Sequence, residues 1–112
     1  MLPKKNRLFL KSDFEKVFLQ GKTIDCSELR IKLLFTKNSQ SRFGIIVGRK
    51  VVSLATKRNR LKRRLRAILY SFLPEFKKTF DAVLIVKKDL SPKSFKEVKE
   101  ILKKAFLGQN LI

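Results

Sequence analysis

The residues that could do chemistry are concentrated in one stretch, residues 57–66, with the sequence KRNRLKRRLR. Seven of these ten residues are Lys or Arg, and none is acidic. At about 100° per residue, the apolar residues here and just beyond recur on one narrow stripe of a helix, namely Leu61, Leu65, Ile68, Leu69 and Phe72. Asn59, Arg63 and Arg66 fall nearly opposite that stripe. The stretch therefore predicts an amphipathic helix that is apolar towards a core and cationic outwards.

Like charges on this helix stand one turn apart, for example Arg60 and Arg64 or Lys62 and Arg66. Each such pair repels by roughly a few tenths of a kcal/mol, and no Asp or Glu nearby relieves the repulsion. A bound polyanion would turn this repulsion into binding energy. The pattern favours a nucleic-acid surface over the alternative, a solvated basic face.

Composition supports a single globular domain over residues 1–112, because 44% of the residues are hydrophobic and the length suits one small sheet with a few helices. The net charge is +19, from 28 basic and 9 acidic residues. Between Glu28 and Glu75 there is no acid, whereas thirteen Lys and Arg occur. We therefore expect a continuous cationic surface.

Several kinds of catalytic site are excluded by residue type. The chain has no His, so Ser-His and Cys-His nucleophiles are impossible, and its acids are scattered. A single cysteine, Cys26, can form neither an internal disulfide nor a zinc cluster. No apolar run reaches the roughly 20 residues of a membrane span, and no signal peptide is evident. We expect a cytoplasmic binding protein that breaks no bonds by itself.

RNA is the favoured nucleic acid. No helix-turn-helix, ribbon or zinc module of a DNA reader is evident. The chain has ten Phe and one Tyr, which could supply both a core and exposed rings. Cationic grooves with exposed aromatic rings are typical of proteins that hold single-stranded RNA.

The predicted elements follow in the order αββαβα. An extended basic segment, residues 1–11, precedes a helix that begins at Ser12 with a capping box to Glu15 and ends at Gly21. Strands at 28–36 and 42–52 are predicted to form a hairpin. The basic helix then runs to Pro74, a buried strand covers 81–88, and a last helix opens at Ser91-Pro92. The fold class is α+β, with helices packed on a small mixed sheet and a parallel strand pair joined by the basic helix.

Particular residues resemble a known family. The run Arg58-Asn59-Arg60-x-Lys62-Arg63-x-x-Arg66, preceded by Val47-Gly48-Arg49-Lys50, is similar to the signature of the bacterial ribonuclease P protein component. The opening Arg7-Leu8…Asp13-Phe14…Val17-Phe18…Gly21 also resembles the start of that family. The resemblance covers essentially the whole chain. Departures are Gly48, where the family usually has Ser, and a loop before Arg58 that is one residue longer.

The resemblance implies the protein subunit of a ribonucleoprotein endonuclease that removes the 5′ leader from precursor tRNA. It implies that the RNA subunit holds the catalytic Mg²⁺ and performs the hydrolysis, so that no catalytic or metal-binding residue is expected in the protein. Its partners would be the catalytic RNA and precursor tRNA, with no membrane and no obligate protein partner. It also implies a left-handed crossover, against the usual rule.

The site residues carried over from the resemblance form two groups. The expected contacts to RNA are Arg58, Asn59, Arg60, Lys62, Arg63, Arg66, Arg49 and Lys50. The expected cleft for the leader, which Lys50 also borders, is lined by Phe14, Phe18, Arg30 and Lys32. Arg30 and Lys32 stand where the family tends to have apolar or aromatic residues, so we expect this cleft to depend more on phosphate charge. Two alternatives remain: a structural RNA-binding protein, such as a ribosomal one, and an architectural DNA-binding protein.

Overall fold

The computed structural model describes residues 2–112. In chain order its elements are a 3-10 turn η1 (Lys4–Asn6), α1 (Lys11–Gln20), β1 (Lys22–Asp25), β2 (Leu29–Phe35), β3 (Arg42–Val47), α2 (Ala55–Phe72), a 3-10 turn η2 (Leu73–Glu75), β4 (Phe80–Val86) and α3 (Phe95–Gly108). The strands form one mixed sheet in the order β1-β2-β4-β3. This confirms the α+β class with helices packed on a small mixed sheet.

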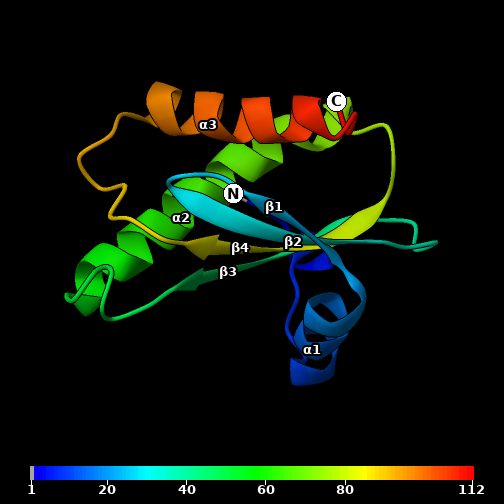
Figure 1. Ribbon diagram of the computed structural model, residues 1–112, viewed down its shortest axis with the longest axis horizontal. Helices are drawn as coiled ribbons and strands as arrows, with labels where there is room; N and C mark the ends of the chain where they lie inside the picture. The colour runs from blue at the N-terminus through cyan, green and yellow to red at the C-terminus, as the bar shows by residue number, and fades with distance from the viewer. Residues whose placement is uncertain (1) are drawn as a thin grey trace.

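The sheet is sandwiched between unequal layers (Figure 1). The helices α2 and α3 cover one face, and the shorter α1 lies on the other. The large core lies on the side of α2 and α3, where the predicted stripe of α2 is buried: Leu61, Leu65, Ile68, Leu69 and Phe72. Aromatic rings of this core meet edge to face, as in the pair Phe72–Phe106, with ring centroids 5.4 Å apart. The opposite face carries only a small cluster around Val17 and Val83.

The strand β4 lies in the centre of the sheet, antiparallel to β2 and parallel to β3. Six of its seven residues are buried, because both of its faces are covered, as the continuous apolar run predicts. The parallel β3–β4 pair joined by α2 is confirmed, and the left hand of that crossover stays a prediction. The predicted hairpin of 28–36 with 42–52 is wrong, because β4 separates the two strands. The second of them also ends at Val47.

The strand β1 is absent from the predicted order, which is therefore αβββαβα rather than αββαβα. It has only four residues, three of them exposed, and lies at an edge of the sheet. An exposed edge strand needs no hydrophobic alternation, so the sequence carried no periodic signal for it. It pairs antiparallel with β2, with Lys22 opposite Leu33.

Two helix starts differ from the predictions. The helix α1 begins at Lys11 after Leu10 and has no side-chain cap, so the capping box at Ser12 is wrong. The helix α3 begins after Ser94, whose hydroxyl accepts from the Glu97 N–H at 3.1 Å, while Glu97 accepts from the Ser94 N–H at 2.9 Å. The predicted opening at Ser91-Pro92 is therefore three residues too early. The pattern Ser-x-x-Glu occurs at both places, and only α3 uses it.

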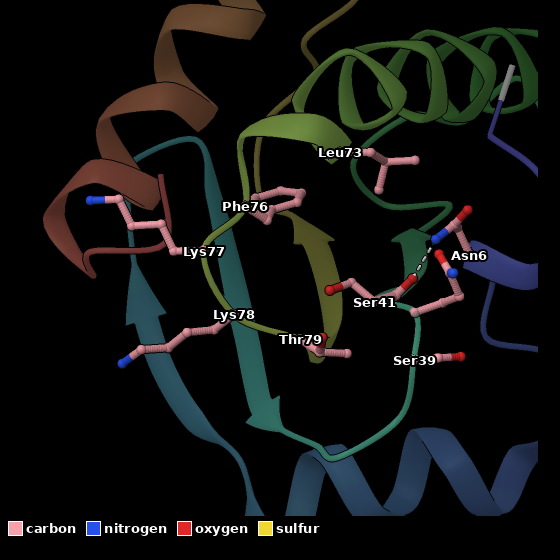
Figure 2. A pocket seen from close by; sticks show the side chains of 9 residues that line it. Asn6, Ser39, Ser41, Leu73, Phe76, Lys77, Lys78 and Thr79 are labelled. Atoms are coloured by element: carbon pink, nitrogen blue, oxygen red, sulfur yellow. Dashed lines mark hydrogen bonds between the residues drawn. The ribbon is translucent and has the colours of Figure 1, made fainter.

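The N-terminal segment is not an extended arm. Leu2, Asn6 and Leu8 are buried, and the Leu8 N–H donates to the Phe43 carbonyl at 2.9 Å along the free edge of β3. Asn6 Nδ2 donates to the Ser41 carbonyl at 2.8 Å, at the wall of a polar pocket of about 210 Å³ (Figure 2). The segment is therefore fixed to the sheet and is part of the domain.

Candidate nucleic-acid interface

The outer surface of α2 is cationic along its first three turns. Asn59, Arg60 and Arg63 are exposed, Lys62 is half-buried, and the helix contains no acidic residue. The apolar stripe on the opposite side fixes the helix against the core, so these side chains point outwards. The structure thus brings this part of the predicted RNA-contacting group together on one surface.

Two arginines of α2 also hold neighbouring loops. The Arg58 guanidinium donates to the carbonyls of Val52 (3.0 Å) and Ser53 (2.8 Å) in the loop before the helix. The Arg64 guanidinium donates to the Lys93 carbonyl at 2.6 Å, just before α3. Because these bonds use only Nη1 of each residue, other N–H groups of both guanidinium groups remain for a ligand.

Arg49 and Lys50 are exposed in the turn that follows β3, and they lead towards the first turn of α2. Backbone bonds from Val51 and Val52 to the Gly48 carbonyl, both 3.1 Å, close this turn. A side chain at Gly48 would meet no described atom within 4 Å, so the packing does not require glycine there. The family's usual Ser would fit at this place without change.

Arg66 is less exposed than a fully outward-facing residue would be. It is half-buried and lines a pocket with Arg7, Phe14 and Gly44. Partial burial, and secondly the nearby Arg7 guanidinium, lower the pKa of Arg66. Ideal helix geometry gave only the angle of Arg66 on α2, and it did not show that the N-terminal segment packs beside it.

The face of the sheet beneath α1 carries Arg30 and Lys32, two of the residues expected to line the leader cleft, and is called the leader face below. Residues that pair across a ladder point to the same face, and two such rows are Lys32–Val83–Gly44 and Arg30–Ile85–Ile46. The helix α1 packs over one end of this face, against Leu34 and Val83. Ile46 stays 37% exposed on the edge strand, and Arg30 is exposed as well. The uncovered end is therefore apolar in the middle with a basic residue at its side.

Phe14 and Phe18 project from α1 to different degrees. Phe14 is half-buried, packed on the small cluster and seated over Gly44, which has no side chain to displace it. Phe18 is 38% exposed. Phe14 therefore packs on the small cluster while part of its ring stays accessible, and Phe18 has the greater exposed surface.

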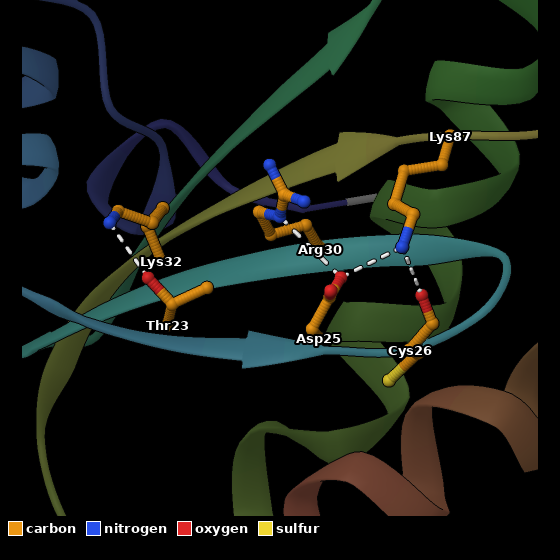
Figure 3. Close-up of polar contacts among 6 residues, drawn as sticks. All are labelled: Thr23, Asp25, Cys26, Arg30, Lys32 and Lys87. Carbon is orange, nitrogen blue, oxygen red and sulfur yellow. Dashed lines mark hydrogen bonds and ion pairs between the residues drawn. The ribbon is translucent and has the colours of Figure 1, made fainter.

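The basic residues of the leader face have partners within the protein (Figure 3). Lys32 Nζ donates to Thr23 Oγ1 at 2.8 Å, and Arg30 Nε lies 3.4 Å from Asp25 Oδ1. Lys87 Nζ donates to the same carboxylate oxygen at 2.8 Å. The hydrogen bond that Asp25 accepts from Lys87, with a smaller contribution from Arg30, lowers the pKa of Asp25. Asp25, on the strand that the prediction missed, therefore offsets part of the positive charge expected here.

An ion-pair network fixes α1 to the sheet. Arg42 on β3 contacts Asp81 through two bonds of 2.7 and 3.0 Å, and its Nη1 lies 3.3 Å from Asp13 on α1. The bonds to Asp81 raise the pKa of Arg42. The Asp81 side chain is 6% exposed, so its charge depends on Arg42 for compensation. This network was not predicted from the sequence, because its members lie on three separate elements.

Two kinds of site are absent from residues 2–112. No group of three or more Cys, Asp or Glu side chains gathers as metal ligands. In the same range, no helix is long and apolar enough to cross a bilayer. The half-buried Cys26 has no partner thiol, and partial burial raises its pKa.

This chain is similar to proteins of one known family. The family model for ribonuclease P matches residues 2–108. The ribonuclease P protein component of Pseudanabaena sp. (strain PCC 6903) is 39% identical over 104 residues, which cover 92% of this chain and 90% of that protein. The RNase P protein from Thermotoga maritima has a similar structure, with a TM-score of 0.77 and 35% identity over 88% of this chain and 92% of that one.

A second solved structure, the RNase P protein of Staphylococcus aureus, shares the fold with a TM-score of 0.83 over 95% of this chain and 96% of that one. At 18% identity it supports the architecture alone. The matched range of the family model includes the motif on α2, and the relative of known structure at 35% identity has the same overall fold. This chain therefore belongs to the family of bacterial ribonuclease P protein components.

Proposed function

We propose that this chain is the protein subunit of ribonuclease P, and that it binds the catalytic RNA through α2 and the 5′ leader of precursor tRNA along the sheet face beneath α1. The observation that carries the proposal is the acid-free cationic surface of α2, whose Arg66 lines one pocket together with Phe14 of α1. The alternative of a ribosomal structural protein is not favoured by the family assignment.

The protein's contribution is electrostatic and positional. Two RNAs repel each other, and a protein of net charge +19 placed between them screens that repulsion. The RNA subunit holds most of the Mg²⁺ and performs the hydrolysis. This division of labour is supported by the residue types of the chain, because residues 2–112 offer no carboxylate cluster for a metal and the chain has no histidine to act as a base.

The leader lies on the sheet face as a single strand. Exposed rings such as that of Phe18 stack bases, each worth about 1–3 kcal/mol. Arg30 and Lys32 contact the phosphates, and a phosphate that approaches Arg30 competes with Asp25 for the same guanidinium. Arg49 and Lys50 continue the basic surface from this face towards α2.

Reconstitution tests the function. The protein is mixed with a bacterial ribonuclease P RNA and labelled precursor tRNA at a Mg²⁺ concentration too low for the RNA alone. We expect cleavage at the mature 5′ end that requires the protein. Tight RNA binding without any stimulation of cleavage would refute the proposal and would favour a structural RNA-binding role. Preference for duplex DNA over precursor tRNA in competition would instead favour the architectural alternative.

Salt dependence tests the electrostatic part. If about six cationic side chains neutralise phosphates, the log–log slope of affinity against salt is about −4, at about −0.7 per contact. Removing one contact with Arg63→Ala should make the slope shallower by about 0.7–1. The control is Lys103→Ala, which removes the same charge from an exposed position on α3. Equal slopes for the two variants would count against α2 as the contact surface.

A further inference from the structure

A pocket of about 130 Å³ lies where the N-terminal segment, α1, β3 and α2 meet. Its polar walls are the side chains of Arg7, from the N-terminal segment, and Arg66, from the middle of the chain. Its apolar walls include Phe9, Phe14 and Ile45. Phe14 belongs to the leader face and Arg66 to the contact helix, so the pocket stands at the junction of the two surfaces described above.

The two guanidinium groups in this pocket lack acidic partners. None of the residues that line the pocket is Asp or Glu, and within residues 2–112 neither Arg7 nor Arg66 takes part in a salt bridge. The two charges are close enough for Arg7 to lower the pKa of Arg66. Repulsion of this kind favours an anion between the groups, since arginine stays protonated and binds phosphate with its fork of N–H donors.

The local backbone makes the pocket a fixed one. Arg7 pairs with Phe43 at the edge of β3, and its Nε donates to the Leu2 carbonyl at 2.9 Å, which leaves its two terminal nitrogens for a ligand. Beyond Leu8 the chain turns into α1. Ile45 lies two residues further along β3, and its N–H points to the same edge as that of Phe43. A third donor is thus directed at the pocket side of the strand.

An aromatic ring stands at the mouth of the pocket. Phe9 is 63% exposed, and it is held between the anchored Leu8 and the start of α1. An exposed ring beside two cationic groups is the arrangement that binds a nucleotide, with the phosphate on the guanidinium groups and the base on the ring.

We propose that this pocket binds one phosphate of the bound RNA between Arg7 and Arg66, with its nucleotide against Phe9, and so joins the contact surface of α2 to the leader face in one continuous path. The inference rests on the proposed function for the identity of the RNA. It adds Arg7 and Phe9, neither of which was among the expected RNA contacts, to the residues that contact RNA.

A double-mutant cycle tests the shared phosphate. The variants are Arg7→Gln, Arg66→Gln and their combination, and the control pair combines Lys5→Gln with Arg66→Gln, because Lys5 is an exposed cation of the same segment. Each arginine variant should weaken RNA binding about tenfold, the usual effect of losing a hydrogen bond to a charged group. The Arg7/Arg66 double variant should lose less affinity than the product of the two single fold-losses, because both residues bind the same phosphate. In the control pair, the fold-losses in affinity should multiply.

Three binding measurements identify the source of the phosphate. Losses in the affinity of the protein for the catalytic RNA alone place the phosphate in that RNA. Losses seen only when the holoenzyme binds precursor tRNA, and not mature tRNA, place it in the leader. The proposal would be overturned if the fold-losses in affinity of Arg7→Gln and Arg66→Gln multiply in the double variant. It would also be overturned if Arg7→Gln has wild-type affinity for the catalytic RNA, for precursor tRNA and for mature tRNA.

A second variant covers the structural role of Arg7. If Arg7→Gln lowers the unfolding temperature, the cycle is repeated with Phe9→Ala and Arg66→Gln, because the exposed Phe9 ring contributes little to the core. Coupling is again expected, and its absence would overturn the proposal. Wild-type protein that fails to stimulate cleavage refutes the proposed function, while stimulation without coupling refutes the pocket alone.

Discussion

The Phe14 ring lies over Gly44, so the effect of Gly44→Ala on the free energy of unfolding should change sign when Phe14 is removed. Gly44 is buried on β3 and has no positive φ, so alanine suits its backbone. An added Cβ, however, would lie 2.5 Å from Phe14 Cζ and closer still to Cε1. The third nearest atom, at 3.4 Å, also belongs to that ring. Only the Phe14 ring therefore opposes a side chain at this position.

The magnitudes follow from two opposing effects. Overpacking costs about 1–3 kcal/mol, and replacing glycine in a strand by alanine contributes about 0.5–1 kcal/mol of stability. In the wild type, Gly44→Ala should therefore lower the free energy of unfolding by about 1 kcal/mol, since the difference of these ranges is about 0–2.5 kcal/mol. In the Phe14→Ala background the clash is gone, and the same mutation should stabilise the protein by about 0.5–1 kcal/mol.

The cycle consists of the wild type, Gly44→Ala, Phe14→Ala and the double mutant. Urea denaturation measures the free energy of unfolding of each protein, and the dependence of that free energy on urea concentration should be the same for all four. The coupling of about 1–3 kcal/mol corresponds to about 4–12 °C in unfolding temperature for a domain of this size. If Gly44→Ala has the same effect in both backgrounds, within about 0.5 kcal/mol, the ring does not lie over Gly44. The leader wall would then be built differently.

Three further predictions concern the polar contacts. Arg42→Met should lower the free energy of unfolding by about 3 kcal/mol in urea denaturation, because it leaves the buried Asp81 uncompensated; a loss no larger than that of an exposed Lys variant would contradict this. Asp25→Asn should cost stability above about pH 5, since the folded-state pKa of Asp25 is lowered below its ordinary value of about 3.9. That difference should disappear as the pH falls through the folded-state pKa, and thermal unfolding across pH 2–7 measures it; a difference that persists at the lowest pH would exclude the Lys87 bond as its cause. Ser94→Ala should cost about 1 kcal/mol by removing the cap of α3, whereas Ser12→Ala should cost far less in the same melts.

The sequence by itself determined the amphipathic helix α2. Its apolar stripe repeats at helical spacing, so local periodicity was enough to predict both its buried and its cationic sides. The lack of histidine excluded the common nucleophiles without any structure. The buried run of β4 likewise identified a covered strand, because a strand with two covered faces must be apolar throughout.

Only the tertiary structure decided which elements lie side by side. Strand order depends on pairing between distant segments, so the insertion of β4 between β2 and β3, and the presence of β1, left no local trace. The same holds for charges. The sequence did not show which acid lies near Arg30, yet the fold sets it beside Asp25, and the fold also brings Arg7 and Arg66 to one pocket. Electrostatic interactions act over distances in space, and residue spacing along the chain does not encode those distances.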